Sequence, residues 1–270
     1  MSEEETAQTY PVVADNAINR HKERGNYDVE TVHSIFNSTP VAHVSFIPDP
    51  TNPAPVVLPM IARVGQFPGD ENPACYVHGY VSTRLFKVGQ KTGQSDGIPM
   101  CIAATKVVNL VLALTPFNHS YDYRSAIIHG RATLLDPNEN TEENIWAMKL
   151  ITDGIVPERW DNSRVPPDKG EITSTRILKV HIESASAKIR DSGVKDDKKD
   201  LNNPEVRGKI WTGVIPYVET LGTPIPNETN MVTTVPAYIT EHIKEHNKKA
   251  GGGEAGNSFV SRVVGSMFGA

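Results

Sequence analysis

Alternating apolar and polar positions predict a chain that is built mainly from β-strands. Residues 41–47, VAHVSFI, alternate with a period of two, as a half-buried strand does. The same pattern, or a short apolar run between turn residues, returns in further segments, which are residues 56–64, 74–80, 99–114, 123–135 and 175–189. Residues 99–114 suit either a pair of strands or one bent strand. We therefore expect about six strands, joined by long connections.

Helical periodicity is confined to a few segments. Asp28 is a candidate N-cap for a helix that ends before Pro40. The side chains on the apolar face of this helix are Val32, Ile35 and Phe36. Residues 141–155 are amphipathic, with acidic residues at the positive end of the helix dipole. Shorter helices are expected near Ser82 and over residues 237–249.

The order of these elements predicts a mostly β fold. Pro59 stands inside the second strand and cannot donate to a ladder, so this strand is expected at a sheet edge or a bulge. Many strands, few helices and long connections favour a small closed β-barrel with flanking helices over a doubly wound sheet.

Composition along the chain suggests three parts. Residues 1–25 are polar and charged and are expected to form an N-terminal arm, followed by a barrel domain over residues 26–217. Residues 218–270 form a C-terminal extension with a short helix and a flexible, glycine-rich tail. Residues 190–209 are charged and lack an apolar period, which predicts a solvated loop.

The bulk composition excludes several classes of function. The formal net charge of −5 is unlike that of a dedicated nucleic-acid binder, and no apolar run approaches the ~20 residues that span a bilayer. The acidic start of the chain lacks the features of a secretory signal. Cys75 and Cys101 are therefore expected to be reduced, buried thiols in a cytoplasmic protein.

The first candidate site is the segment HGYVSTRLFK, which begins at His78. A strand ends there, a glycine permits a turn, and hydroxyl and basic side chains stand at the start of an expected helix. Such groups form a phosphate cradle. The cradle residues are Ser82, Thr83, Arg84 and Lys87. The alternative is an ordinary helix cap with solvent-facing basic side chains.

The second candidate site is the polar and aromatic segment NHSYDYRS, residues 118–125, at the entry to an apolar strand. Its candidate binding residues are His119, Tyr123, Arg124 and Ser125. A plain stack at a strand edge is the alternative. The histidines show no metal-ligand spacing, and the sequence contains no dinucleotide fingerprint, P-loop or nucleophile elbow. No metal site is predicted.

Three segments, taken together, resemble the FMN-binding split-barrel superfamily, which includes pyridoxamine 5′-phosphate oxidase. The similarity is greatest to the flavin-nucleotide-binding branch that also contains the nitroimidazole-resistance reductases. The segments are residues 23–46, 76–87 and 118–135, and the likeness continues to residue 217. The C-terminus departs from the oxidases because it has no arginine–histidine pair that would hold pyridoxal phosphate. Vitamin-B6 activity is therefore not expected.

The resemblance implies a homodimer that holds FMN at its interface. Ser82, Thr83, Arg84 and Lys87 would bind the phosphate, and Leu58, Pro59 and Met60 would run along the isoalloxazine. His119, Tyr123, Arg124 and Ser125 would complete the pocket from the second subunit. His78 matches a histidine that lies at the flavin in the nitroimidazole reductases, although a strand-end histidine bonded to backbone is an equal alternative.

These implications predict an FMN-dependent oxidoreductase that acts on a small molecule, with electrons exchanged with a nicotinamide donor or oxygen. Two other functions fit the same fold. One is a non-catalytic flavin-binding or sensor protein, and the other is a haem-binding split-barrel protein.

Overall fold

The structure, a computed structural model, describes residues 8–49, 51–80, 85, 97–136, 138 and 141–251. The chain divides into two compact units. Unit 1 comprises Met1–Lys106 and Arg124–Ile189, and unit 2 comprises Val107–Tyr123 and Arg190–Ala270. No helix within the described residues has the length and apolar character that crossing a membrane requires.

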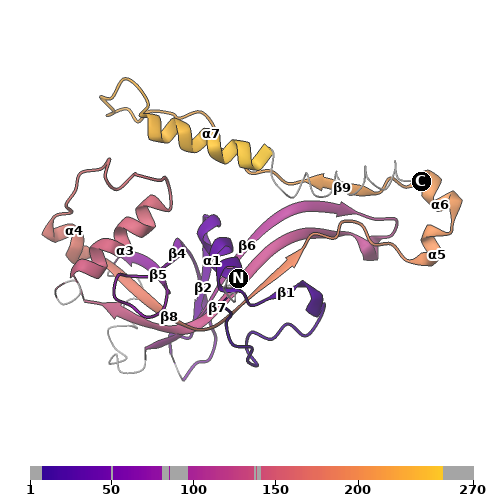
Figure 1. Cartoon of the computed structure of the whole chain (residues 1–270), viewed down its shortest axis with the longest axis horizontal. Helices are drawn as coiled ribbons and strands as arrows, with labels where there is room; N and C mark the ends of the chain where they lie inside the picture. The colour runs from indigo at the N-terminus through magenta and orange to yellow at the C-terminus, as the bar shows by residue number, and fades with distance from the viewer. Residues whose placement is uncertain are drawn as a thin grey trace, which may run out of the picture. The chain divides into compact units, whose positions relative to one another are not determined.

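Unit 1 is dominated by strands (Figure 1). Its short elements are η1 (Lys22–Arg24), β1 (Gly25–Asn26), α1 (Val29–Ser38), β2 (Ala42–Phe46), β3 (Val56–Met60), β4 (Ala62–Gly65), β5 (Ala74–Tyr80), α3 (Thr141–Asp153) and α4 (Lys169–Ser174). The long strands are β6 (Ile98–Leu112), β7 (Ser120–Leu135) and β8 (Thr175–Arg190), which continue into unit 2. Residues 99–114 thus hold one long strand.

The strands form one sheet in the order β3-β2-β6-β7-β8-β5-β4, with β1 paired to β8. Together with β9 (Gly213–Pro216), which pairs with β6, the described residues contain nine strands. The expectation of a mostly β fold is confirmed, but the count of about six is not. The chain splits residues 56–64 into two strands at Ile61, and β1 and β9 are too short to show a period of two.

The two edges of the sheet are consecutive in the chain. β3 ends at Met60, β4 begins at Ala62, and Ile61 alone joins them. Because neighbouring Cα atoms are about 3.8 Å apart, the edges must approach each other at this residue. No described hydrogen-bonded pairing joins β3 to β4, so the closed barrel is not confirmed. Pro59 lies on edge strand β3, as predicted.

Two apolar clusters stabilise unit 1. The large cluster contains the buried face of α1 and the alternating residues of β2 and β6. The small cluster gathers around Tyr76 and Ile177, where α3 contacts the sheet. The start of α1 is as predicted, because the Asp28 side chain accepts a hydrogen bond from the Thr31 amide at 2.7 Å. Cys75 and Cys101 are free, and Cys101 is only half-buried.

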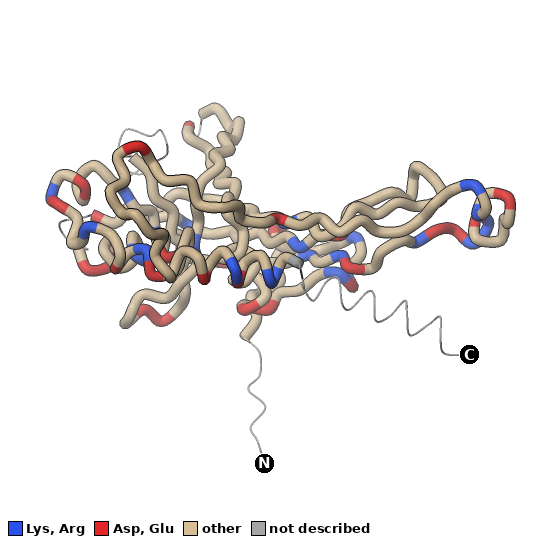
Figure 2. Tube along the Cα trace, turned by 90° about the horizontal axis from the view of Figure 1, so that it is seen from above, with Lys and Arg blue, Asp and Glu red and all other residues tan. Residues whose placement is uncertain are grey.

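Unit 2 contains fewer packed elements. Besides β9, they are η2 (Pro116–Asn118), α5 (Lys198–Leu201), α6 (Pro204–Lys209) and α7 (Ala237–Gly251). The prediction of a plain solvated loop over residues 190–209 is wrong, because α5 and α6 lie in it and Arg190 is buried. These helices are too short for an apolar period, and Asn203 starts α6 by accepting two backbone N–H bonds. Figure 2 shows basic and acidic residues close together along this segment.

Candidate functional site

His78 is the best-defined candidate that the structure describes. It lies in β5 and pairs with Ile177 of β8. Strand alternation places its side chain on the same face as Tyr76 of the small cluster. The Nδ1 atom of His78 is buried and has no hydrogen-bond partner among the described residues. Burial lowers the pKa of the imidazole, so the ring is neutral near pH 7. A buried nitrogen without a partner is unusual, and such an atom can form a hydrogen bond with a bound molecule.

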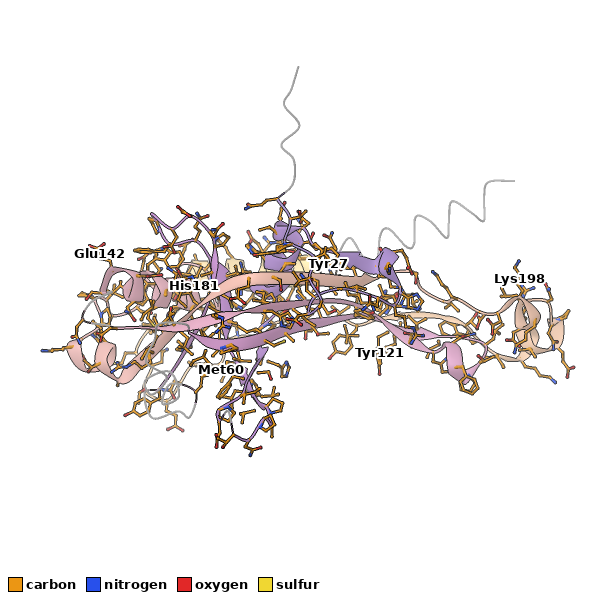
Figure 3. The ribbon with its side chains drawn as sticks, turned by 90° about the horizontal axis from the view of Figure 1, so that it is seen from below. Tyr27, Met60, Tyr121, Glu142, His181 and Lys198 are labelled. Carbon is orange, nitrogen blue, oxygen red and sulfur yellow. The ribbon has the colours of Figure 1, made fainter. Side chains whose placement is uncertain are left out.

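The predicted ring-contact residues lie on the open edge of the sheet. Leu58 and Met60 pack their side chains against the large cluster, whereas Pro59 is exposed (Figure 3 labels Met60). An edge strand keeps one row of backbone N–H and C=O groups unpaired. Any contact from this strand to a flat polar ring would therefore come from its backbone and from Pro59.

Strand register brings this edge close to His78. Ala62, two residues after Met60, pairs with Val77, which precedes His78. Ile61, the residue between the two edges, packs in the small cluster on the His78 face. The sequence-predicted edge residues and the predicted histidine thus converge on one part of unit 1.

The structure does not describe the residues that were predicted to form the phosphate cradle. Ser82, Thr83, Arg84 and Lys87 are outside the described residues. Leu85, which stands among them, is described and is fully buried in the large cluster. Along the chain, the four residues come shortly after Tyr80, the last residue of β5, with Val81 between Tyr80 and Ser82.

The second predicted segment falls in both units. In unit 2, the Nδ1 atom of His119 accepts a hydrogen bond from the Ala113 amide at 2.9 Å, and Tyr123 is half-buried. In unit 1, the Ser125 hydroxyl donates to the Lys188 carbonyl at 3.2 Å. The Arg124 side chain is exposed and forms no hydrogen bond or ion pair with a described residue, so its guanidinium is available for an anion.

A buried polar network beside His78 was not predicted. The Tyr76 hydroxyl donates to Glu143 at 2.9 Å, and the Lys179 ammonium bridges Glu143 and Asp70 at 2.7 Å each. Burial, together with Glu143, raises the pKa of Tyr76, so its hydroxyl stays protonated. Burial alone would lower the pKa of Lys179, but its two carboxylate partners raise it. Strand alternation could have placed Tyr76 beside His78, whereas the carboxylates come from segments distant in sequence.

Comparison with known proteins identifies a family. The family model described as pyridoxamine 5′-phosphate oxidase matches residues 28–189, which is more than half of the chain. This range contains α1, strands β2 to β7, all of β8 except its last residue, and both candidate segments. No curated protein matches the chain.

Two solved structures share this fold over most of the chain. A flavocytochrome from Azotobacter vinelandii has 28% sequence identity and a TM-score of 0.68, and the match covers 85% of this chain and 97% of that one. A FAD and haem binding protein from Mycobacterium smegmatis has 21% identity and a TM-score of 0.67, with coverages of 82% and 97%. Both matches span more residues than the family model, so the similarity extends beyond the family region.

Proposed function

The chain belongs to the pyridoxamine 5′-phosphate oxidase family, and we propose that it is a flavin-binding homodimer that acts as an oxidoreductase on a small molecule. The observation that carries this proposal is the match to the Azotobacter flavocytochrome, whose name denotes a flavin-containing cytochrome. At 28% identity over 85% of this chain, the match supports more than a shared fold.

The described residues near the β3 edge and His78 have groups that could bind a flavin. Among the described residues, the open edge of β3 has unpaired backbone groups for the polar edge of the ring, and His78 has a buried nitrogen without a hydrogen-bond partner. Arg124 supplies an exposed cation that has no ionic partner among the described residues. We assign the phosphate to Ser82, Thr83, Arg84 and Lys87, because they follow the end of β5 in a segment rich in donors. We propose FMN as the flavin, with FAD as the alternative.

A bound flavin would supply hydride or one-electron chemistry with a small molecule, from a nicotinamide donor or oxygen. The protein's own part is to bind, to orient and to exclude water. His78 is neutral, so it can form a hydrogen bond to substrate or ring without adding a charge. The small cluster behind it keeps one side of the site free of water.

The homodimer is supported by the exposed apolar side chains of unit 2. Phe117, Ile225 and Met231 are more than 90% exposed, and Trp211 and Val232 are largely exposed. These exposed apolar side chains are the ones that we propose a second copy of the chain covers. Light scattering at micromolar concentration should give a dimer, and a flavin-loaded monomer would contradict a site shared between subunits.

An absorption spectrum of the purified protein tests the flavin. Bands near about 375 and 450 nm are expected, and chromatography of the released cofactor distinguishes FMN from FAD.

Arg84→Ala should lose about 2–4 kcal/mol of FMN binding, roughly thirty- to a thousandfold in Kd, because the phosphate loses a bidentate partner. Its affinities for FMN and riboflavin should converge, and Arg84→Lys should fall between. Arg207→Ala, on exposed α6, is the matched control. Parental FMN affinity in Arg84→Ala would refute the cradle.

A non-catalytic flavin-binding or sensor protein is the nearest rival. Stopped-flow mixing with NADH or NADPH separates the two functions. Rapid bleaching of the band near about 450 nm supports an enzyme, whereas a stable flavin spectrum supports storage or sensing.

Haem binding in addition to flavin is the second candidate function. It is supported by the two solved structures that cover more than 80% of this chain, whose names include a cytochrome and a haem protein. An iron ligand needs a free imidazole nitrogen. His119 already accepts a hydrogen bond at Nδ1, so its Nε2 atom carries the proton in the neutral ring. The imidazole of His242 on α7 forms no hydrogen bond with a described residue, so it is the better ligand in unit 2. A strong band near about 400 nm that disappears in His242→Ala would support this assignment.

A further inference from the structure

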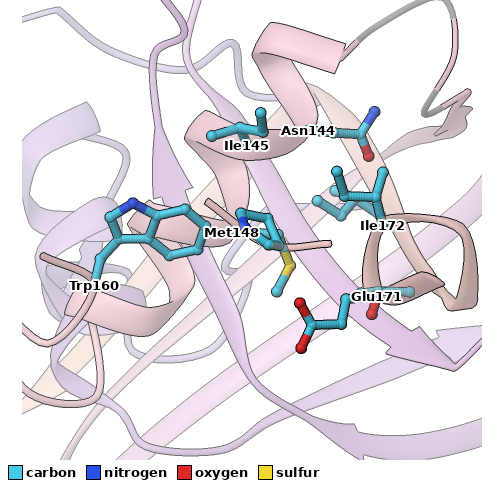
Figure 4. Close-up of a pocket in the computed structure, with 9 residues that line it drawn as sticks. Asn144, Ile145, Met148, Trp160, Glu171 and Ile172 are labelled. Carbon is cyan, nitrogen blue, oxygen red and sulfur yellow. The ribbon is translucent and has the colours of Figure 1, made fainter. Parts of the chain in front are cut away.

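Helix α3 contributes to the walls of two cavities that differ in size. The smaller has a volume of about 60 Å³ and is lined by residues of α3, α4 and β8, among them Met148 and Ile172 (Figure 4). The larger has a volume of about 470 Å³ and is lined by residues of α1, β4 and α3. Pockets that bind small molecules have volumes of about 300–1,000 Å³. The larger cavity can therefore hold a whole small molecule.

The side chain of Arg63, on β4, lines the larger cavity although it is only 5% exposed. Its Nη1 atom donates to the Thr39 and Ala62 carbonyls at 3.1 Å each, and its Nη2 atom donates to the Gly154 carbonyl at 2.6 Å. These three acceptors are uncharged. Burial lowers the pKa of Arg63, but an arginine stays protonated at neutral pH. The cavity wall therefore contains a buried positive charge that has no carboxylate partner among the described residues.

Two of the five N–H groups of this guanidinium remain unused. One is on Nε, which lies so close to Gly154 that a Cβ atom there would be 2.2 Å away. The other is on Nη2, which uses one of its two hydrogens. Thr39 and Gly154 follow the ends of α1 and α3, so the negative ends of two helix dipoles neutralise part of the charge. Buried charges are normally paired, and an anion in the cavity would neutralise the rest.

Two further charged side chains line the cavity, and they are paired. The Lys149 ammonium lies 3.3 Å from Asp153 and 2.6 Å from Asp161. Asp161 is largely exposed and is outside the cavity wall, so water and salt screen its charge. The wall itself thus carries two positive side chains and one negative side chain. An excess of one positive charge suits a carboxylate better than a phosphate, which has nearly two negative charges.

The uncharged part of the wall provides an apolar surface. Trp146 contacts Tyr76 edge-on, with 5.2 Å between the ring centroids, and Leu150 lies one helical turn further along α3. The Asn37 amide is engaged, because it donates to the Val64 carbonyl and accepts from the Val64 N–H. The indole N–H of Trp146 forms no hydrogen bond with a described residue. A flat apolar group can pack against Trp146 and Leu150.

We infer that this space, the Arg63 cavity, is a second binding site and that it binds a small monocarboxylate with a flat apolar body. The carboxylate neutralises Arg63, and the apolar body packs against Trp146 and Leu150. The described residues that line the Arg63 cavity include none of those that we assign to the flavin. The inference therefore goes beyond the proposed function and does not depend on it.

Binding of benzoate, compared with its neutral analogue benzamide, tests this inference. The isotope-labelled full-length protein is titrated in excess FMN, and the tryptophan indole N–H signals are followed by NMR. Benzoate should shift the signal of Trp146, which is assigned with Trp146→Phe, and should leave that of Trp211 in unit 2 unchanged. Benzamide should bind at least about tenfold more weakly, because it cannot neutralise Arg63.

Two variants change the charge of the wall in opposite directions. Arg63→Met should weaken benzoate at least about tenfold. Because Arg63 also bonds to the ends of α1 and α3, Asp153→Asn provides a test that leaves this arginine in place. The new amide oxygen can still accept from the Trp160 amide, and loss of the negative charge should tighten benzoate about three- to fivefold. Glu30→Gln makes the same charge change at an exposed position of α1 and should leave benzoate binding unchanged.

Three results would overturn the Arg63 cavity as a binding site. They are the absence of a Trp146 shift with benzoate, equal affinities for benzoate and benzamide, and parental benzoate affinity in Asp153→Asn. None of them depends on flavin. Failure of the proposed function is seen separately, in the absorption spectrum of the same protein with FMN.

Discussion

The two apolar clusters both belong to unit 1, whereas the best-buried side chains of unit 2 include a charged pair. In unit 1, Ile128, Ile102 and Leu178 are fully buried. In unit 2, Asp122 and Arg190 are buried against each other, and Asn109 donates to Asp122 at 3.0 Å. Large apolar side chains such as Ile225 remain exposed there.

This difference separates two sources of stability. Unit 1 removes enough apolar surface from water to specify its own fold. Unit 2 depends on strand pairing and on the hydrogen-bonded cluster of Asp122, Arg190 and Asn109. Its exposed apolar side chains would add stability only when a partner covers them. A buried ion pair adds little to the free energy of unfolding compared with an apolar replacement of both partners. Removal of one partner lowers this free energy strongly, because the other charge stays buried without its partner. Unit 2 should therefore be sensitive to single polar changes.

The largest effect is expected for Asp122→Ala. The change leaves the Arg190 guanidinium buried without its carboxylate, at a cost of about 3–5 kcal/mol. Hydrogen exchange should report faster exchange in the pairing of β9 with β6, and unchanged protection of the β2–β3 pairing in unit 1. Asp191→Ala removes an exposed carboxylate next in sequence to Arg190 and should be nearly neutral. Equal loss of protection in both units would show that the two are not independent.

A matched pair of isoleucine changes compares the units directly. Ile128→Ala, at a fully buried site of unit 1, should lower the free energy of unfolding by about 2–5 kcal/mol because it leaves a cavity. Ile225→Ala, at a site that is 91% exposed, should change it by less than about 0.5 kcal/mol in a dilute monomer. Denaturant titrations at two protein concentrations check both values. If a second copy covers Ile225, its substitution should instead promote dissociation at low concentration.

A smaller effect is expected in the polar network of unit 1. Tyr76→Phe removes the hydrogen bond to Glu143, but Lys179 still neutralises this carboxylate, so the cost should be about 1–2 kcal/mol. Tyr217→Phe, at an exposed position of unit 2, is the control. A cost for Tyr76→Phe as large as that of Asp122→Ala would remove the contrast between the units.

The sequence predicted unit 1, which has an apolar core, better than unit 2, whose elements bury little. The pattern of apolar residues located β2, β5 and β8 to within a residue or two of each end, because β2 buries one face and β5 and β8 have buried residues on both faces. β9 and α5 bury little and left no such pattern. The break at Ile61 was also missed, since alternation is the same for one strand and for two strands separated by a single residue.

The candidate site was predictable only in part. Strand ends, glycine and donor-rich segments indicated where His78 and the phosphate cradle should lie. They could not reveal the Arg63 cavity, because its walls come from α1, β4 and α3, whose packing depends on contacts distant in sequence. The partner of Arg190 was equally inaccessible, since Asp122 lies 68 positions away.

The smallest effect concerns pH, and it belongs to unit 1. Burial lowers the pKa of His33, whose Nε2 atom lies 2.7 Å from the Tyr10 hydroxyl. Since the unfolded chain binds this proton more readily, the stabilisation is complete above the unfolded pKa of about 6.5 and is lost as the pH falls below it. His78 acts in the same direction. His33→Gln should therefore reduce the slope of the free energy of unfolding against pH between about pH 7 and 5, by less than about 1.4 kcal/mol per pH unit.

Tyr10→Phe is the control variant, because it removes the hydroxyl and keeps His33. It should retain the slope, because burial is the main cause of the pKa shift of His33. Urea titrations across this pH range check both variants, and a flat profile in Tyr10→Phe alone would assign the effect to the hydrogen bond.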